Sequence, residues 1–185
     1  MSNQKENLRV KYAITEALFT LLKKKSFSEI TVSDIVKEAG VARSSYYRNF
    51  ENTESIIEEY LILLHEEILN TNTTQDISLF SMDSLTTRFT HSCSCFLSKK
   101  SYILTLYKNG FGSQMQEIIN QYVIELAGTM SVHSIHRYVL YFISGATFNI
   151  LIQWLKNGAD ESPYEIASFC SNIFLNGIKD FISES

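Results

Sequence analysis

The sequence predicts an all-α protein, and three observations carry the prediction. Leu, Ile, Lys, Glu and Ala fill long stretches in which apolar residues recur at helical spacing. Only one proline, Pro163, and seven glycines interrupt the 185 residues. An apolar share of 45%, with 12 Phe and 10 Tyr, suffices to bury a sizeable core. We expect about nine helices, arranged as a small N-terminal three-helix domain and a larger helical body.

The first two helices follow from spacing and capping residues. Apolar positions four, seven and eight apart predict a first helix that ends near Lys25, where three lysines suit the negative end of the helix dipole. Thr31 and Asp34 form a capping-box pattern at the start of a short second helix. Gly40 follows that helix and is placed for the left-handed conformation that ends it.

A third helix must begin soon after this turn, because Tyr46 and Phe50 stand four apart and can cover the first two helices. If the helix starts near Ala42, its opposite and lateral faces carry Arg43, Ser44, Tyr47 and Arg48. A long helix braced against two short ones joined by a glycine turn is the helix-turn-helix arrangement. Its second short helix can enter the major groove of DNA.

Helices also fill the body. Asn52 is a predicted cap for a fourth helix, and the polar stretch 70–78 reads as a loop. Gly158 closes the penultimate helix, and Ser162 with Glu165 opens the last one. The five helices after the loop are expected over 81–97, 100–109, 113–130, 133–157 and 162–182.

Charge is divided unevenly along the chain. Residues 1–50 hold nine Lys and Arg against five Asp and Glu, a net +4, whereas residues 51–185 hold seven against fifteen, a net −8. The two values sum to the overall −4. A basic head on an acidic body indicates a polyanionic partner for the head alone.

The sequence argues against a membrane protein and against a secreted protein. The apolar stretch 138–155 approaches the length of a membrane span, but polar residues interrupt it, so we expect a mostly buried helix and no membrane association. No secretory signal opens the chain, and three cysteines without framework spacing indicate free thiols in the cytoplasm.

Catalysis and metal binding are not expected either. The sequence contains no glycine-rich phosphate loop and no nucleophile elbow, which argues against an enzyme. Cys93 with Cys95, and His133 with His136, lack the further ligands of a zinc site. We predict no metal and no cofactor.

The run from Val10 to Ile57, centred on "ITVSDIVKEAGVARSSYYRNFENTESII", resembles the DNA-binding domain of the TetR family of transcriptional regulators. "WLKNGADESPYEIASF" is similar to a segment of one TetR subgroup that includes regulators of dihydroxyacetone-kinase operons. The resemblance implies a helix-turn-helix domain over 1–52 and a ligand-binding and dimerisation domain over 53–185. It also implies that the last two helices pair with their copies in a homodimer.

The helix faces and the resemblance predict a DNA-binding set: Thr31, Arg43, Ser44, Ser45, Tyr47, Arg48 and Asn49. Arg43 and Arg48 are candidates to read guanine edges, because a guanidinium offers two parallel donors; a solvated helix face is the alternative. By resemblance Tyr47 donates its phenol hydrogen to a phosphate, with plain packing as the alternative. Thr31 lies at a helix start that favours phosphate, although capping alone explains it nearly as well.

Two positions depart from the family pattern. Ala42 stands where members usually carry a Ser or Thr that caps the recognition helix, so this helix start should be less well fixed. Thr53 stands where a Lys commonly faces a phosphate, so one backbone contact is expected to be missing.

For the body, the resemblance implies an inducer cavity among the helices that carry eight apolar and aromatic residues: Tyr102, Leu106, Tyr107, Phe111, Met115, Tyr122, Tyr138 and Phe142. Ordinary core packing is the alternative for each. The ligand is a small organic molecule of unspecified charge. Gly145 and Gly177 are expected inside the dimerising helices, as close contact points between the two copies.

These inferences predict a ligand-responsive transcriptional regulator. We expect a repressor, because repression is the commoner outcome in the family. A homodimer would bind a near-palindromic double-stranded operator, with two recognition helices about 34 Å apart. The alternative is a protein-binding co-regulator with weak or no DNA binding of its own, which the acidic body and Thr53 favour.

Overall fold

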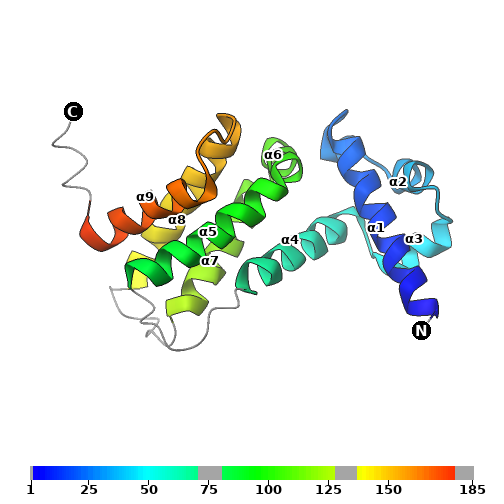
Figure 1. The fold of residues 1–185 in the computed structure, drawn as a ribbon. Helices are drawn as coiled ribbons and strands as arrows, with labels where there is room; N and C mark the ends of the chain where they lie inside the picture. Colours follow the sequence, from blue (N-terminus) through cyan, green and yellow to red (C-terminus); the bar gives the residue numbers. More distant parts are fainter. Residues whose placement is uncertain (1, 71–80, 128–136, 178–185) are drawn as a thin grey trace. The chain divides into compact units, whose positions relative to one another are not determined.

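The structure is a computed structural model that describes residues 2–70, 81–127 and 137–177. Within these ranges the chain forms nine α-helices and one short 3-10 helix, Phe27–Glu29, and it contains no strand (Figure 1). The prediction of an all-α class is confirmed. The helices are α1 Ser2–Leu22, α2 Val32–Ala39, α3 Arg43–Asn49, α4 Thr53–Leu69, α5 Met82–Ser98, α6 Lys100–Lys108, α7 Gly112–Ala127, α8 Arg137–Lys156 and α9 Pro163–Asn176.

The chain divides into two compact units. The first comprises Met1–Leu63 and Thr105–Gly112, and the second comprises Leu64–Leu104 and Ser113–Ser185. Helix α4 therefore changes unit after Leu63, and α6 changes unit after Leu104. The functional division after Asn52 stays a prediction.

In the first unit, α2 and α3 both lie against α1 (Figure 1). The predicted apolar stripe of α1 is largely buried, because Ile14, Ala17, Leu18 and Leu22 are at most 4% exposed. The segment around α6 joins this unit through Phe111, whose ring meets that of Phe27 edge to face at 4.9 Å between centroids. These contacts build one core beneath the two short helices.

The local signals at α2 form as predicted. Thr31 caps the helix: its Oγ1 accepts from the Asp34 N–H at 3.2 Å, and its own N–H donates to Asp34 Oδ2 at 2.9 Å. Gly40 takes the left-handed conformation, with φ of 63°, and ends the helix. Helix α1 ends at Leu22 rather than near Lys25, because the chain turns there and Lys25 pairs with Asp34 of α2.

In the second unit, α5 and α9 make the most extensive contact, and the Phe89 and Phe174 rings meet at 5.5 Å. Helix α8 is long and apolar enough to cross a membrane by length and composition, a test that a core helix also passes. Eight of its residues are buried in this unit, including the polar Ser144 and Thr147. The expectation that most sides of this helix would be covered is only partly met, because Tyr138, Val139 and Phe142 are exposed.

The turn between α8 and α9 is well defined. Gly158 has φ of 114° after the end of α8, and the Trp154 indole Nε1 donates to the Glu161 carbonyl at 3.1 Å. Ser162 then caps α9 together with Glu165, whose carboxylate accepts from the Ser162 N–H at 2.7 Å. The predicted signals Gly158, Ser162 and Glu165 are confirmed.

The end of α9 differs from the prediction. Gly177 was expected inside a helix reaching 182, but it is the C-cap after Asn176, with φ of 81°. A positive φ is accessible to glycine without steric strain, so Gly177 can terminate the helix. Residues 178–182 of the predicted helix lie outside the described residues, as do 128–130 and 133–136 of the two helices before it.

Candidate nucleic-acid interface and ligand residues

Helix α3 has one buried and one exposed face. Tyr46 is 0% exposed and Phe50 is 3% exposed, so both belong to the core as predicted. On the other side Tyr47 is 52% exposed, and Arg43 and Arg48 are exposed as well. The spacing therefore separates two adjacent tyrosines: one anchors the helix, and the other faces outward beside two arginines.

Arg43 links α2 to α3. Its Nη1 donates to Ser33 Oγ at 3.1 Å, and its Nη2 donates to the Tyr47 hydroxyl at 3.2 Å. The guanidinium carbon also lies 5.6 Å from the centroid of the Tyr47 ring, within the range of a cation–π contact. The arginine is thus held at the surface in a defined position, with a planar cation directed outward.

The remaining predicted DNA contacts are less uniform. Ser44 and Arg48 are exposed, and Arg48 makes no hydrogen bond or ion pair within the described residues. Ser45 and Asn49 are half-buried, and the Asn49 Nδ2 donates to the Ser45 carbonyl at 2.8 Å. The Asn49 amide is therefore already bonded to its own helix. All seven residues remain predicted DNA contacts. The four exposed ones, Arg43, Ser44, Tyr47 and Arg48, are the most accessible to DNA.

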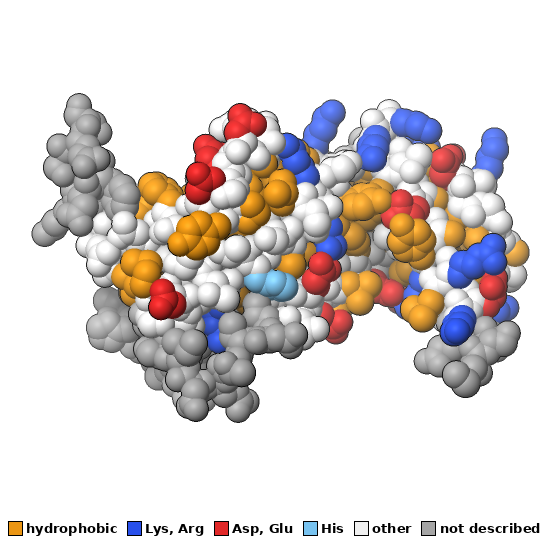
Figure 2. Space-filling model, in the orientation of Figure 1, with side chains coloured by type: hydrophobic (Ala, Val, Ile, Leu, Met, Phe, Trp, Pro, Cys, Tyr) orange, Lys and Arg blue, Asp and Glu red, His pale blue; other side chains and the backbone are white. Residues whose placement is uncertain are grey.

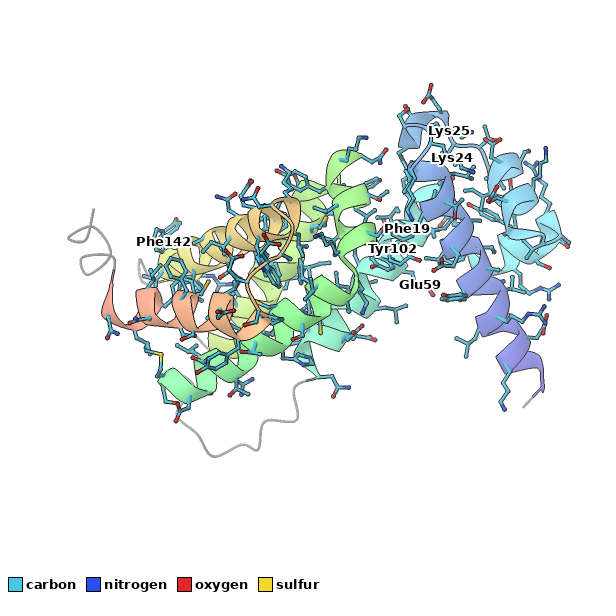
Figure 3. The ribbon with its side chains drawn as sticks, turned by 45° about the horizontal axis from the view of Figure 1, so that its top comes forward. Phe19, Lys24, Lys25, Glu59, Tyr102 and Phe142 are labelled. Atoms are coloured by element: carbon cyan, nitrogen blue, oxygen red, sulfur yellow. The ribbon has the colours of Figure 1, made fainter. Side chains whose placement is uncertain are left out.

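The amino end of α2 carries a charge of its own. Thr31 is exposed, but its hydroxyl donates to Asp34 Oδ2 at 2.8 Å. Lys25 Nζ lies 2.7 Å from the same oxygen (Figure 3 shows Lys25 at the end of α1, beside α2). The Lys25 hydrogen bond, followed by those from Thr31, holds the pKa of the Asp34 carboxyl well below its usual value. A phosphate approaching Thr31 would meet this Lys–Asp pair at the start of the helix.

Sequence reasoning missed Ser33 and two ion pairs, Lys25 with Asp34 and Lys11 with Glu59. Ser33 is the α2 partner of Arg43, and only the folded arrangement of α2 and α3 brings these two side chains together. Lys11 of α1 pairs with Glu59 of α4 at 2.7 Å and also lies 5.5 Å from the Phe50 ring centroid. Lysines and glutamates are common on helix surfaces, so no sequence signal distinguishes these pairs from solvated charges.

The eight predicted ligand residues are divided between the two units. Leu106, Tyr107 and Phe111 belong to the first unit, and the other five belong to the second. Within the second, Met115 and Tyr122 of α7 are each 2% exposed.

Two of the predicted ligand residues lie at the surface of a single chain. Tyr138 is 69% exposed and Phe142 is 63% exposed, and Figure 3 shows Phe142 on the outer side of α8. Ligand contact by all eight residues stays a prediction.

The glycines differ in their surroundings. Gly145 lies within α8, and a Cβ built there would meet no atom within 4 Å. Gly177 is exposed at the end of α9. A close helix crossing at Gly145 is sterically open, whereas the conformation of Gly177 has a local explanation as a helix terminator.

All three cysteines, Cys93, Cys95 and Cys170, are buried free thiols. Across the described ranges, no group of three or more His, Cys, Asp and Glu could hold a metal ion. His133 and His136 lie outside those ranges.

Two family models match the sequence. The model for "Bacterial regulatory proteins, tetR family" matches residues 14–60, and the model for "Transcriptional regulator C-terminal region" matches residues 83–176. The second match alone spans half of the chain, and the two together leave only short segments unmatched. No curated protein gives a significant match.

Solved structures share the fold over nearly the whole chain. A TetR transcriptional regulator from Streptococcus agalactiae 2603V is 19% identical, with a TM-score of 0.67 over 94% of this chain and 98% of that one. The dihydroxyacetone kinase operon activator DhaS is 16% identical, with a TM-score of 0.60 over 92% and 97%. The fatty acid degradation regulator FadR from Bacillus halodurans is 14% identical, with a TM-score of 0.59 over 92% and 96%. At these identities the likeness establishes the fold alone.

Proposed function

Because the chain belongs to the TetR family of bacterial transcriptional regulators, we propose that it binds a near-palindromic DNA operator as a homodimer and responds to a small organic ligand. As a regulator of this fold it acts by binding rather than by catalysis, and we place it in the cytoplasm. One observation supports the DNA-binding role above the others: α3 buries Tyr46 and Phe50 and turns Arg43, Tyr47 and Arg48 outward.

The proposed recognition step uses the two faces of α3 differently. Arg43 and Arg48 can each offer paired donors to a guanine edge in the major groove, and Tyr47 can donate to a phosphate. The Tyr46 and Phe50 anchors fix the helix against α1, so the outward side chains start from a defined position. Lys and Arg side chains are spread over the visible surface of this unit (Figure 2), which suits a polyanionic partner.

The proposed dimer uses α8 and α9. Exposed apolar side chains gather on these two helices, with Tyr138 and Phe142 on α8 and Tyr164 and Phe169 on α9 between 45% and 69% exposed. Figure 2 shows hydrophobic side chains at the surface of the second unit, to which α8 and α9 belong. Large apolar side chains that stay exposed in a single chain are candidates for burial in an interface. A second copy would cover these side chains and supply the second recognition helix.

Repression is the proposed outcome, because it is the commoner one in the family. The ligand would bind in the second unit and shift the population between dimer forms that match the operator spacing and forms that do not. One structural neighbour, DhaS, is an operon activator, so a reporter assay should also test activation as a variant of this proposal.

A co-regulator that binds another protein instead of DNA is the second candidate. It is favoured by Thr53, which begins α4 at the position where family members commonly carry a phosphate-facing Lys. The absence of a side-chain cap at Ala42 points the same way.

Fluorescence anisotropy with labelled DNA from the protein's own upstream region decides between the two candidates. We expect saturable binding whose log affinity falls linearly with log salt concentration, and a shallower slope for Arg48→Ala. Lys108→Ala, which removes an exposed cation on α6, is the matched control. Binding that is absent at low salt, or that Arg43→Ala and Arg48→Ala leave unchanged, would refute the DNA-binding proposal and favour the co-regulator.

A further inference from the structure

The interior of the second unit is unusually polar for a helical core. Six Ser and Thr side chains are at most 8% exposed: Ser84, Thr86, Ser92, Ser144, Thr147 and Ser171. Two of them bond within the unit, Ser92 Oγ to the Arg88 carbonyl at 3.1 Å and Ser144 Oγ to Asn120 Oδ1 at 2.6 Å. Thr147 Oγ1 and Ser171 Oγ are buried and have no partner in the structure. Buried polar groups without partners are costly, so this interior is not organised for packing alone.

Arg88 of α5 is the charged member of this interior. Its side chain is half-buried, its Nε is fully shielded from solvent, and that nitrogen has no hydrogen-bond partner. No ion pair involves its guanidinium within the part of the chain that is described. A partly buried guanidinium normally has a carboxylate or phosphate partner, because removing part of an unpaired charge from water is costly. The described residues do not supply that partner, which makes an external anion the natural candidate.

Tyr122 of α7 provides a second unused donor. The side chain is 2% exposed, and its hydroxyl has no partner in good hydrogen-bond geometry, although the Ser92 hydroxyl is close enough to act on it. Burial raises the pKa of Tyr122, whereas the neighbouring Ser92 hydroxyl and the Arg88 charge lower it. Tyr122 therefore keeps its proton near neutral pH and lies close to Arg88 and Ser92. A buried phenol normally finds a well-oriented partner for its O–H, and the Ser92 hydroxyl does not reach that geometry here.

Neither acid of the adjoining helix segments bonds to Arg88. Glu67 of α4 pairs with Lys99 at 2.6 Å, and Glu125 of α7 is half exposed and lies 3.9 Å from His65, a pair that is ionic only when the histidine is protonated. An apolar wall adjoins the donors, since Met115, Ile118 and Ile119 occupy the buried side of α7 one and two turns before Tyr122. The cationic and phenolic donors thus lie at the end of an apolar helix face, an arrangement suited to an amphiphilic anion.

We propose that the Arg88 guanidinium and the Tyr122 hydroxyl, beside Ser92, bind the anionic group of the effector, a carboxylate or a phosphate on an apolar carbon skeleton. This inference rests on the proposed function, because it assigns a ligand class to the effector-binding unit. The half-exposed part of Arg88 provides the side from which an anion can reach the shielded donors.

Thermal unfolding of the purified full chain tests the proposal, with octanoate as the carboxylate probe, hexyl phosphate as the phosphate probe and octan-1-ol as the neutral probe. A ligand that binds the folded state raises the melting temperature in a concentration-dependent way. We expect at least one of the two anions to raise it and octan-1-ol to raise it less. The more effective anion identifies the headgroup.

Three variants test whether the anion binds at Arg88 and Tyr122. Arg88→Met and Tyr122→Phe should weaken anion binding, Arg88→Met by roughly 10- to 100-fold, the usual effect of losing a charge-assisted hydrogen bond. Lys108→Met, which removes an exposed cation, should leave binding unchanged. If neither anion stabilises the wild type more than it stabilises Arg88→Met, the proposal is overturned.

The melting temperature of the ligand-free protein is a second, independent test. An arginine that is kept for ligand binding destabilises the protein when no ligand is bound, so Arg88→Met should keep or raise the melting temperature. A marked decrease would show that Arg88 is structural and would also overturn the proposal. DNA binding is measured separately without any anion, so operator binding with no anion effect leaves the proposed function standing and removes only this inference.

Discussion

Arg43 and Tyr47 form one unit on the exposed face of α3, with the arginine Nη2 3.2 Å from the tyrosine hydroxyl and the guanidinium 5.6 Å from the ring centroid. Because Tyr47 accepts a hydrogen bond from Arg43, its own O–H proton remains available to a phosphate. The pair therefore presents a base-reading cation and a backbone donor from adjacent turns. Loss of either side chain should affect DNA binding in a distinguishable way.

For the arginine, we expect Arg43→Ala to cost about 1–3 kcal/mol of binding free energy and to relax base preference at one position of each half-site. Tyr47→Phe should weaken binding to all sequences alike, because it removes a phosphate donor. Anisotropy titrations against the upstream DNA and single-base variants of it measure both effects. Unchanged affinity for both variants would remove this face of α3 from the interface.

The start of α3 can be improved. Ala42 occupies the N-cap with extended φ and ψ of −69° and 145°, but it has no side-chain oxygen to accept from the first turn. Ala42→Thr should raise the free energy of unfolding by about 0.5–2 kcal/mol, the usual contribution of an N-cap. Ala42→Val, which has the same shape without the hydroxyl, is the matched control. Equal stability of the two variants in urea titrations would contradict the capping explanation.

Acid should weaken the first unit through Asp34. Its pKa is depressed in the folded protein, so its contribution to stability is present above the unfolded value of about 3.9 and is lost as pH falls from there through the lower folded pKa. Asp34→Asn should lower the melting temperature at neutral pH, and the difference from wild type should shrink below about pH 4. Glu38→Gln, an exposed acid of the same helix, controls for the removed charge. A difference that is independent of pH would exclude this carboxylate as the cause.

The cysteines should be inert in the folded protein. Burial raises the pKa of the Cys93 thiol to about 12 and that of Cys170 to about 11, and it also raises the pKa of Cys95. Thiolate is the reactive form, so native protein at mildly alkaline pH should react slowly with an aromatic disulfide reagent. In denaturant all three should react. Rapid titration of one thiol in the native protein would show that its helix opens locally.

Gly145 tests the proposed dimer. A side chain at this position meets no atom within 4 Å in the single chain, so Gly145→Leu should fold and should even gain helix propensity. If two copies of α8 approach each other there, leucine should separate them and light scattering should report a monomer. Gly145→Ala is the conservative control. A Gly145→Leu protein that stays dimeric would place the interface elsewhere.

Much of the fold was predictable because its signals are local. Thr31, Gly40, Ser162 and Gly158 act within a turn of the chain, and the apolar spacing around Tyr46 and Phe50 assigns them to the core without knowledge of any partner helix. The prediction was wrong where a longer helix competed with a local stop, as at Gly177, where the positive φ of a glycine ends α9.

The sequence by itself determined the helical class, the basic helix-turn-helix region and the outward position of Arg43, Tyr47 and Arg48, since periodicity and capping depend on neighbours a few residues away. Only the tertiary structure decided which charges are paired and which are left over. Lys25 meets Asp34, Arg43 meets Ser33, and Arg88 meets no acid of the described chain, although all three read alike as surface cations in the sequence. The physical reason is that pairing depends on distances between elements, and no local pattern encodes those distances.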